Sequence, residues 1–195
     1  GTPATPSIKN DFVNAMNYLD SDPQGTKMTL SMTFPDLANP EGVVEQIEIF
    51  DAEYPGMFTW MGEVNLVKQA LFGNHHAATP KEAIAGWTDF MAVLRKRDIP
   101  ISIHSDLGSD ADPMKYAYLM DEVLMRYPDN KIVWVHMGLS KELSSMDADT
   151  HIATMQSYLD GSPNLYLDIT WRVIFDNYFQ DPDMRAKYVT FLEKN

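Results

Sequence analysis

The stretch DIPISIHSDLG (residues 98–108) has the pattern of a short buried strand that ends at His104 and continues into a polar, glycine-containing loop. The stretch KIVWVHMG (residues 131–138) repeats this design, with His136 at the end of the apolar run. In parallel α/β proteins, side chains at the carboxyl ends of the strands surround the crevice where ligands bind. The two stretches therefore predict a candidate site that contains both histidines at one edge of a parallel sheet.

Further apolar runs of similar length occur on both sides of these two stretches. The predicted strands are 28–34, 58–66, 100–104, 132–136 and 165–169. Each is followed by a segment with helical features, and connections of this length are typical of parallel strand pairs. The pattern predicts an α/β fold of repeated βα units with the helices outside. Five strands fit either a doubly wound sheet or part of a (β/α)₈ barrel, and the polar strand ends favour the barrel.

Four helix starts are marked by a capping residue that stands directly before a proline. These pairs are Asn39-Pro40, Thr79-Pro80, Asp112-Pro113 and Asp181-Pro182. Glu82, three residues after Thr79, adds the pattern of a capping box. Helices are also predicted over 10–19 and 151–159, and Tyr54 and Tyr127, each followed by proline, mark two helix ends.

The composition is that of a single globular domain over residues 1–195. Hydrophobic residues make up 45% and charged residues 22% of the chain, which is close to the globular average. No apolar run approaches the roughly 20 residues that span a bilayer, and the first residues lack the features of a signal peptide. A soluble protein is predicted; its compartment stays open, with the cytoplasm slightly favoured.

Charge and cysteine content exclude several classes of function. The formal net charge is −13 and there is no basic run, so nucleic acid and anionic membranes are not expected as partners. The chain has no cysteine, which excludes disulfides, thiolate nucleophiles and zinc–thiolate sites. Any metal must therefore be bound by His, Asp or Glu. A small-molecule substrate is the expected partner, and a homo-oligomer is possible.

Four neighbouring predicted strands carry Glu63, His104, His136 and Asp168 near their carboxyl ends. Alternation along a strand places His104 on the same face as Ser102, and His136 on the same face as Ile132 and Trp134. Imidazoles and carboxylates without thiolates suit Zn²⁺, Mn²⁺ or Fe²⁺. Such an ion lowers the pKa of bound water to about 7. The pattern therefore predicts a metal site that provides hydroxide at neutral pH.

Three motifs resemble the amidohydrolase superfamily. They are ISIH (101–104), VWVHMG (133–138) and PNLYLDITW (163–171), which resemble strands five, six and seven of its barrel. The resemblance extends from about residue 28 to the end, in particular to the branch that includes aminocarboxymuconate semialdehyde decarboxylase. It implies a metal-dependent TIM barrel, with zinc as the favoured ion, that hydrolyses amide, ester or lactone bonds of a small molecule. Some members are instead non-oxidative decarboxylases.

The same resemblance implies roles for single residues. His104 corresponds to the metal ligand on the fifth strand, and His136 to the histidine of the sixth strand, a candidate catalytic residue that binds metal or substrate. The family's first strand carries a His-x-His pair and its eighth strand an aspartate, and neither feature is found in this sequence. The resemblance therefore implies an incomplete (β/α)₈ barrel that lacks the first two strands and the last. Such a stretch would lack half of the metal ligands and expose two sheet edges.

The remaining candidates each have a functional and a structural interpretation. Glu63 is a metal ligand or an ion-pair partner of Lys68, and Lys68 is a carbamylated bridging lysine or, as we favour, a surface residue. Asp168 is a catalytic residue, an acceptor that orients a histidine, or a loop cap. Trp171 and Arg172 are candidate substrate-binding residues, and Arg172 would bind a carboxylate in bidentate fashion.

Three further histidines are assigned to supporting positions. His75 and His76 are expected in a loop, for which the rim of the site is one candidate place, and His151 is expected to be structural. A different class of function also remains open, namely a non-catalytic α/β module whose histidines are all structural and which binds a partner. That alternative predicts a protein without metal and with a contiguous exposed apolar patch.

Overall fold

The computed structural model describes residues 7–21 and 29–195. Five strands form one sheet in which sequence order and spatial order are the same. They are β1 (Leu30–Met32), β2 (Phe58–Val67), β3 (Ile101–Ser105), β4 (Ile132–Val135) and β5 (Leu165–Leu167). All four neighbouring pairs are parallel. The α/β prediction is confirmed, and the unbroken order is that of a barrel wall rather than of a doubly wound sheet, whose strand order reverses.

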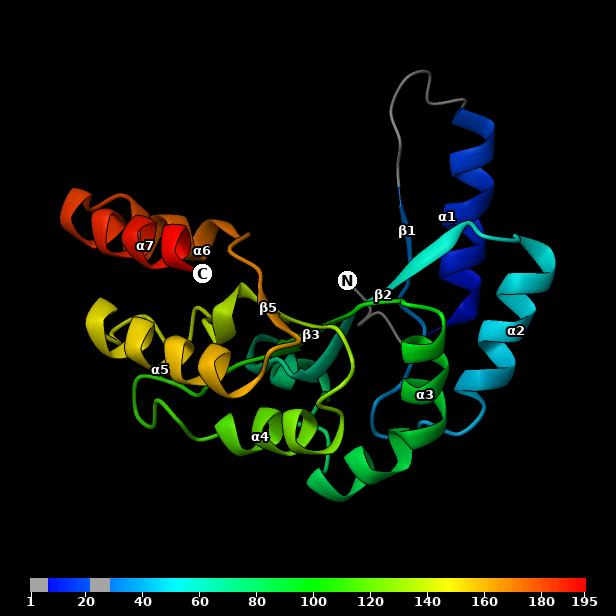
Figure 1. The fold of residues 1–195 in the computed structure, drawn as a ribbon, viewed down its shortest axis with the longest axis horizontal. Helices are drawn as coiled ribbons and strands as arrows, with labels where there is room; N and C mark the ends of the chain where they lie inside the picture. The colour runs from blue at the N-terminus through cyan, green and yellow to red at the C-terminus, as the bar shows by residue number, and fades with distance from the viewer. Residues whose placement is uncertain (1–6, 22–28) are drawn as a thin grey trace.

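The helices lie on the outer side of the curved sheet (Figure 1). They are α1 (Ile8–Ser21), α2 (Val43–Glu53), α3 (Thr88–Lys96), α4 (Ala117–Arg126), α5 (Ala148–Gly161), α6 (Arg172–Ile174) and α7 (Pro182–Lys194). Short turns of other helical types are η1 (Gln69–Asn74), η2 (Lys81–Trp87), η3 (His136–Gly138) and η4 (Phe175–Phe179). None of the described helices is long and apolar enough to cross a membrane.

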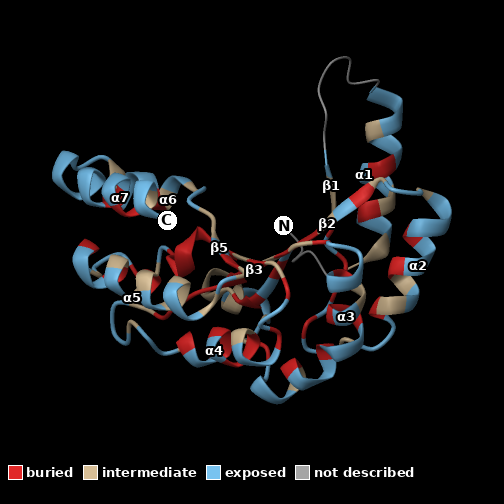
Figure 2. Ribbon diagram, in the orientation of Figure 1, coloured by how far each residue is buried: buried red, intermediate tan, exposed pale blue. Residues whose placement is uncertain are grey.

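The hydrophobic core lies between the sheet and these helices (Figure 2). Alternate strand residues face it, so Ile101, Ile103 and Trp134 are fully buried. Trp87 anchors the helical side: its ring stacks on Tyr127, and its indole N–H donates to the carbonyl of Leu37 over 2.9 Å. The sheet is thus held by its outer face, which leaves its concave face available for a site.

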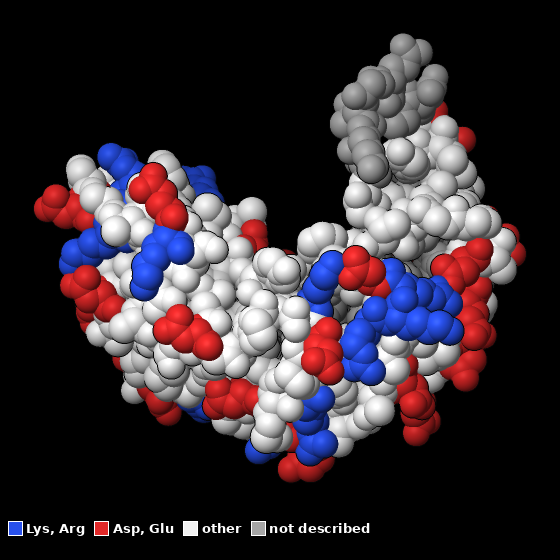
Figure 3. Space-filling view, viewed as in Figure 1, with Lys and Arg blue, Asp and Glu red and all other residues white. Residues whose placement is uncertain are grey.

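The concave face is lined by the other set of strand residues. Trp60, Ser102, Val133 and Tyr166, one from each of four strands, border a cavity of about 680 Å³. The indole N–H of Trp60 donates to the Ser102 hydroxyl over 2.6 Å. Figure 3 shows a hollow that opens between the two ends of the curved molecule.

Strands β2 and β3 approach each other unusually closely at Gly62. A Cβ atom at this position would lie 2.3 Å from the carbonyl oxygen of Ser102, and Gly62 has a φ of +109°. Only glycine tolerates both conditions. The pairing register also shifts between Met61 and Val64. The inserted residue keeps Val64 in the core and leaves Glu63 facing the cavity, as β-bulges near functional sites commonly do.

One of the four predicted helix starts is confirmed in full. Helix α7 begins at Pro182, and the carboxylate of Asp181 accepts hydrogen bonds from the backbone N–H groups of Asp183 and Met184. The predicted helices over 10–19 and 151–159 lie within α1 and α5. Tyr54 and Tyr127 directly follow the last residues of α2 and α4. Met28, the first residue of the first predicted strand, lies outside the described residues.

The other three helix starts were predicted too early. After Pro40 and Pro113 the chain first forms turns, and α2 and α4 begin at Val43 and Ala117 without a side-chain cap. The capping box at Thr79 is wrong, because Pro80 leads into the 3₁₀ turn η2, which has no side-chain cap. Proline is compatible with a turn as well as with a first helical residue, so the same dipeptide signal precedes both structures.

We expect Asp181→Ala to lower the free energy of unfolding by about 1 kcal/mol, because it removes the acceptor for two backbone N–H groups at a helix start. Asp112→Ala is the matched control, since Asp112 also precedes a proline but caps no helix. Thermal or urea unfolding of both variants measures the difference. Equal losses of stability would contradict the assignment of Asp181 as a helix cap.

Candidate metal centre

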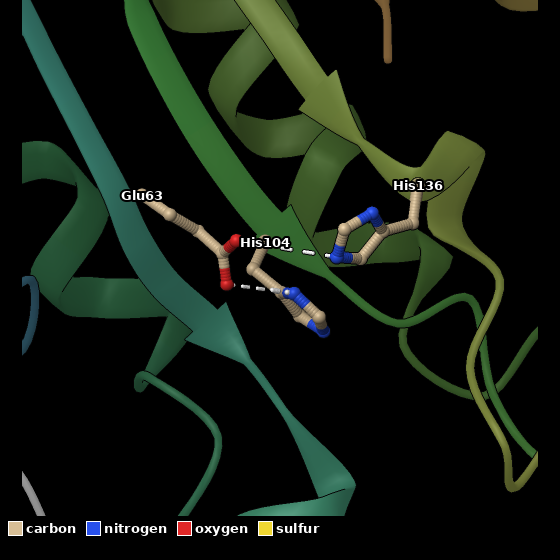
Figure 4. Close-up of side chains that lie close together, drawn as sticks. All are labelled: Glu63, His104 and His136. Carbon is tan, nitrogen blue, oxygen red and sulfur yellow. Dashed lines mark ion pairs between the residues drawn. The ribbon is translucent and has the colours of Figure 1, made fainter. Parts of the chain in front are cut away.

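Three of the predicted residues come together at the carboxyl end of the sheet. Glu63 projects from β2, His104 from β3, and His136 follows the last residue of β4 (Figure 4). One donor atom from each side chain lies within 4.8 Å of the others. The Nδ1 atom of His104 is 3.1 Å from Oε1 of Glu63, and Nε2 of His136 is 3.9 Å from Oε2. The three groups therefore converge on one small volume.

His136 reaches this volume by a route that strand alternation does not predict. His104 pairs with Val135 in the β3–β4 register, so strict alternation would turn His136 to the helix side with Trp134. The prediction that His136 shares the face of Trp134 is wrong. The strand ends at Val135, and His136, Met137 and Gly138 all have positive φ angles of 57°, 52° and 69°. This left-handed turn brings the imidazole to the side of His104, with 5.2 Å between ring centroids.

The left-handed turn is costly for its two non-glycine residues. Each residue other than glycine in this region of φ/ψ space costs about 1–3 kcal/mol. Surrounding packing supports the turn: Met137 is fully buried, and a Cβ at Gly138 would lie 2.8 Å from the Leu107 side chain. The fold therefore maintains an unfavourable backbone where it places a candidate ligand.

The hydrogen bonds of His104 determine which ring nitrogen is available to a ligand. The side chain is 2% exposed, and its Nε2 atom lies 2.9 Å from the carboxylate of Asp106. A carboxylate only accepts, so Nε2 donates its proton to Asp106, and Nδ1 is the nitrogen whose lone pair a bound cation would use. That Nδ1 atom is buried without a hydrogen-bond partner of good geometry, although it faces Glu63. A buried ring nitrogen that lacks a hydrogen-bond partner and faces a carboxylate is suited to bind a cation.

His136 is oriented in the complementary way. Its Nδ1 atom donates to the carbonyl of Thr170 over 2.7 Å, which leaves the lone pair on Nε2, the atom nearest to Glu63. The carboxylate of Asp168 lies 3.1 Å from the same Nδ1 and accepts the backbone N–H of His136. Each imidazole therefore directs one ring nitrogen toward the Glu63 carboxylate, while its other nitrogen is hydrogen-bonded elsewhere.

The electrostatics of the cluster favour an ionised carboxylate. Burial alone would raise the pKa of Glu63, but its close contacts with His104 and Lys68 outweigh burial and lower the pKa to about 2. Lys68 Nζ is 2.7 Å from the Glu63 carboxylate. Burial acts to lower the pKa of His104, but its contacts with Asp106 and Glu63 raise it overall. Burial, together with the nearby His104, lowers the pKa of His136.

The donor set fits a divalent ion of the zinc type. Two imidazoles and one carboxylate form the His₂Glu set of several catalytic zinc sites, in which the fourth position stays open for water or substrate. The Nδ1 atom of His104, which is buried without a hydrogen-bond partner, independently supports a metal ion as its ligand partner.

The other predicted site residues fall into two groups. Asp168 and Trp171 lie at the cluster: the Trp171 ring centroid is 4.8 Å from that of His136. Asp168 also accepts hydrogen bonds from both the backbone N–H and the hydroxyl of Thr170, so it orients the histidine and caps its loop at once. Arg172 is not brought to the cluster, because its side chain is 87% exposed and pairs with Asp176 in the next turn.

Sequence reasoning missed two residues of the site. Asp106 is 1% exposed and fixes the tautomer of His104; the His-x-Asp spacing was the available signal. Asn65 is the residue paired with His104 in the β2–β3 register. It lines a second cavity of about 680 Å³, together with Lys68, His75, His76 and Glu63. The two loop histidines therefore lie along a cavity that adjoins the cluster, as their predicted place at its rim implies.

The parallel strands follow one another in sequence order, and two histidines and one carboxylate cluster at their carboxyl ends. This is the architecture of a partial TIM barrel. A family model described as amidohydrolase matches residues 27–195. The chain therefore belongs to the amidohydrolase family, whose members usually bind divalent metals. No curated protein and no solved structure matches the chain.

Proposed function

We propose that this protein is a metal-dependent hydrolase that acts on a C–N or C–O bond, as in an amide, ester or lactone, of a small molecule. One observation carries the proposal: a carboxylate oxygen of Glu63 and one ring nitrogen each of His104 and His136 lie within 4.8 Å of one another. In this proposal all three side chains hold the metal, and zinc is the favoured ion, with manganese or iron as alternatives.

A divalent ion held there would supply a nucleophilic water at neutral pH and polarise a carbonyl group. The residues of the chain prepare the site for it. Asp106 and the Thr170 carbonyl hold the protons on the far nitrogens of the two histidines. Asp168 orients His136 through the backbone and the ring. Trp171 covers the His136 ring and provides an aromatic surface for the substrate.

The surroundings support a small and partly polar substrate. Glu63 lines both the apolar cavity on the concave face and the second cavity beside it. The second cavity offers amide, ammonium and imidazole groups from Asn65, Lys68, His75 and His76. Each cavity measures about 680 Å³, which lies in the range of small-molecule sites. A substrate that reaches the cluster from either side would meet the Glu63 carboxylate.

Non-oxidative decarboxylation in the same site is the alternative reaction. It needs a cationic group that binds a substrate carboxylate, and Arg172 was the sequence candidate for it. The exposure of Arg172 and its pairing with Asp176 favour the hydrolase. Steady-state kinetics of Arg172→Ala tests this choice: an unchanged KM for every acid substrate that is turned over supports it, whereas a raised KM supports the decarboxylase.

The proposed function is tested by elemental analysis of the purified protein and by a substrate panel. We expect one zinc, manganese or iron per chain, and metal-dependent cleavage of at least one amide, ester or lactone. Glu63→Gln should remove both the bound metal and the cleavage, while His75→Gln should retain the metal. A protein without bound metal, which also fails to bind added Zn²⁺, would support the non-catalytic α/β module instead.

We expect Asp106→Asn to weaken Zn²⁺ binding by about 10-fold, within the range found when an outer hydrogen-bond partner of a metal ligand is altered. The asparagine keeps the shape but removes the charge that stabilises the Nε2 proton of His104. Asp110→Asn is the matched control, because Asp110 accepts backbone bonds from Ser144 and Ser145 and does not contact the cluster. Calorimetric titration of both variants measures the effect, and equal affinities would contradict the role of Asp106.

A further inference from the structure

We propose that His151 is a positioning residue, which holds the left-handed turn that carries His136 into the metal centre. His151 lies on α5, outside the sheet, and its side chain is fully buried. It does not contact the cluster, so it would act through the backbone of the turn. The inference rests on the proposed function only in that it treats His136 as a metal ligand.

The two hydrogen bonds of His151 define its protonation. Its Nε2 atom is 2.9 Å from the carbonyl oxygen of Met137, and its Nδ1 atom is 2.7 Å from the hydroxyl of Tyr188. A carbonyl only accepts, so Nε2 carries the proton and donates it to Met137. The Tyr188 hydroxyl then donates to Nδ1. Both ring nitrogens are satisfied only with this tautomer and only if the turn presents its carbonyl to α5.

Each of the three carbonyl groups of the turn accepts one hydrogen bond. The carbonyl of His136 accepts from the N–H of Leu139, and the carbonyl of Gly138 from the N–H of Leu107. The carbonyl of Met137, between them, accepts from His151. Of these three donors, only His151 acts through a side chain. Residues 136–138 all have positive φ angles, and without this bond a buried carbonyl would lose its donor where the backbone is least favourable.

The contact also links the turn to α7. Tyr188 on that helix is 1% exposed, and its ring centroid lies 5.8 Å from that of His151. Its hydroxyl fixes the tautomer that donates to Met137. A chain of contacts therefore runs from α7 through Tyr188, His151 and Met137 to His136.

The test compares His151→Leu with His151→Gln and with Met155→Ala. The leucine fills the space but donates no hydrogen bond, whereas the glutamine amide can replace the Nε2 donor. Met155 is a fully buried residue of the same helix and controls for general loss of packing. Amide hydrogen exchange of Leu139, measured relative to Ile103 in β3, reports the turn without any metal. Titration with Zn²⁺ reports the site.

We expect His151→Leu to accelerate the relative exchange of Leu139 by about 10-fold and to weaken Zn²⁺ binding by about 10–100-fold. His151→Gln should keep both the relative exchange of Leu139 and the affinity for Zn²⁺ close to those of the wild type. Met155→Ala should change neither quantity, even where it destabilises the whole fold. Equal behaviour of His151→Leu and Met155→Ala in exchange and titration would overturn the inference. If His151→Leu accelerates the exchange of Leu139 as expected but the wild-type protein binds no Zn²⁺, the proposed function is refuted, whereas the role of His151 in positioning the turn is retained.

Discussion

His104→Ala is expected to weaken Zn²⁺ binding by more than about 100-fold, because it removes a ligand, whereas loss of an outer partner of a ligand costs about 10–100-fold. The Nδ1 atom of His104 is buried and directed at Glu63, and its other nitrogen is fixed by Asp106. No other described imidazole except that of His136 lies at the cluster to replace it. A colorimetric titration of the metal against the variant measures the loss.

His76→Ala is the matched control for this experiment. His76 lines the adjoining cavity without joining the three-residue cluster, so its removal should leave Zn²⁺ affinity and stoichiometry as in the wild type. An unchanged stoichiometry and affinity for His104→Ala would eliminate its role as a ligand. The proposed metal centre would then lose its most deeply buried donor.

The folded protein is expected to lose about 3 kcal/mol of stability between pH 6.5 and pH 4 through His151 alone. Burial lowers the pKa of His151 from 6.5 to about 4 in the folded state. The unfolded chain therefore binds a proton first as the pH falls, and stability decreases through this window. Each unit of difference in pKa contributes about 1.4 kcal/mol, and the loss at pH 5 is about 2 kcal/mol.

Urea unfolding at pH 7 and pH 5 measures this effect when the wild type is compared with His151→Gln. The glutamine does not titrate, so the variant should lose about 2 kcal/mol less stability between the two pH values. Carboxylates elsewhere in the chain affect both proteins equally and cancel in the comparison. An identical pH dependence of the two proteins would show that His151 is already accessible to protons in the folded state.

Much of the architecture could be predicted because it depends on local patterns. Short apolar runs that end in polar residues were enough to predict parallel strands and the edge where Glu63, His104 and His136 lie. The helix starts after Pro40, Pro80 and Pro113 were less predictable, since proline and a capping residue precede turns as readily as helices. At those positions the tertiary environment determines where the helix begins.

The way His136 reaches the site could not be predicted from alternation. The left-handed backbone at His136 and Met137 depends on packing against Leu107 and on a hydrogen bond from a helix more than ten residues away. Asp106 was also missed, because the His-x-Asp spacing alone does not show that its carboxylate accepts from the ring of His104. Arg172 shows the opposite case: its sequence position beside Trp171 was favourable, but the chain turns it outward to Asp176.

The close approach of β2 and β3 means that Gly62, which has no side chain, helps to set the distance between Glu63 and His104. Any larger residue at position 62 would push apart the two strands that carry the carboxylate and the first imidazole. The ligands themselves would be intact, yet their spacing would widen on the scale of an atom's radius. Gly62 carries no reactive group, yet the distance between Glu63 and His104 depends on its having no side chain.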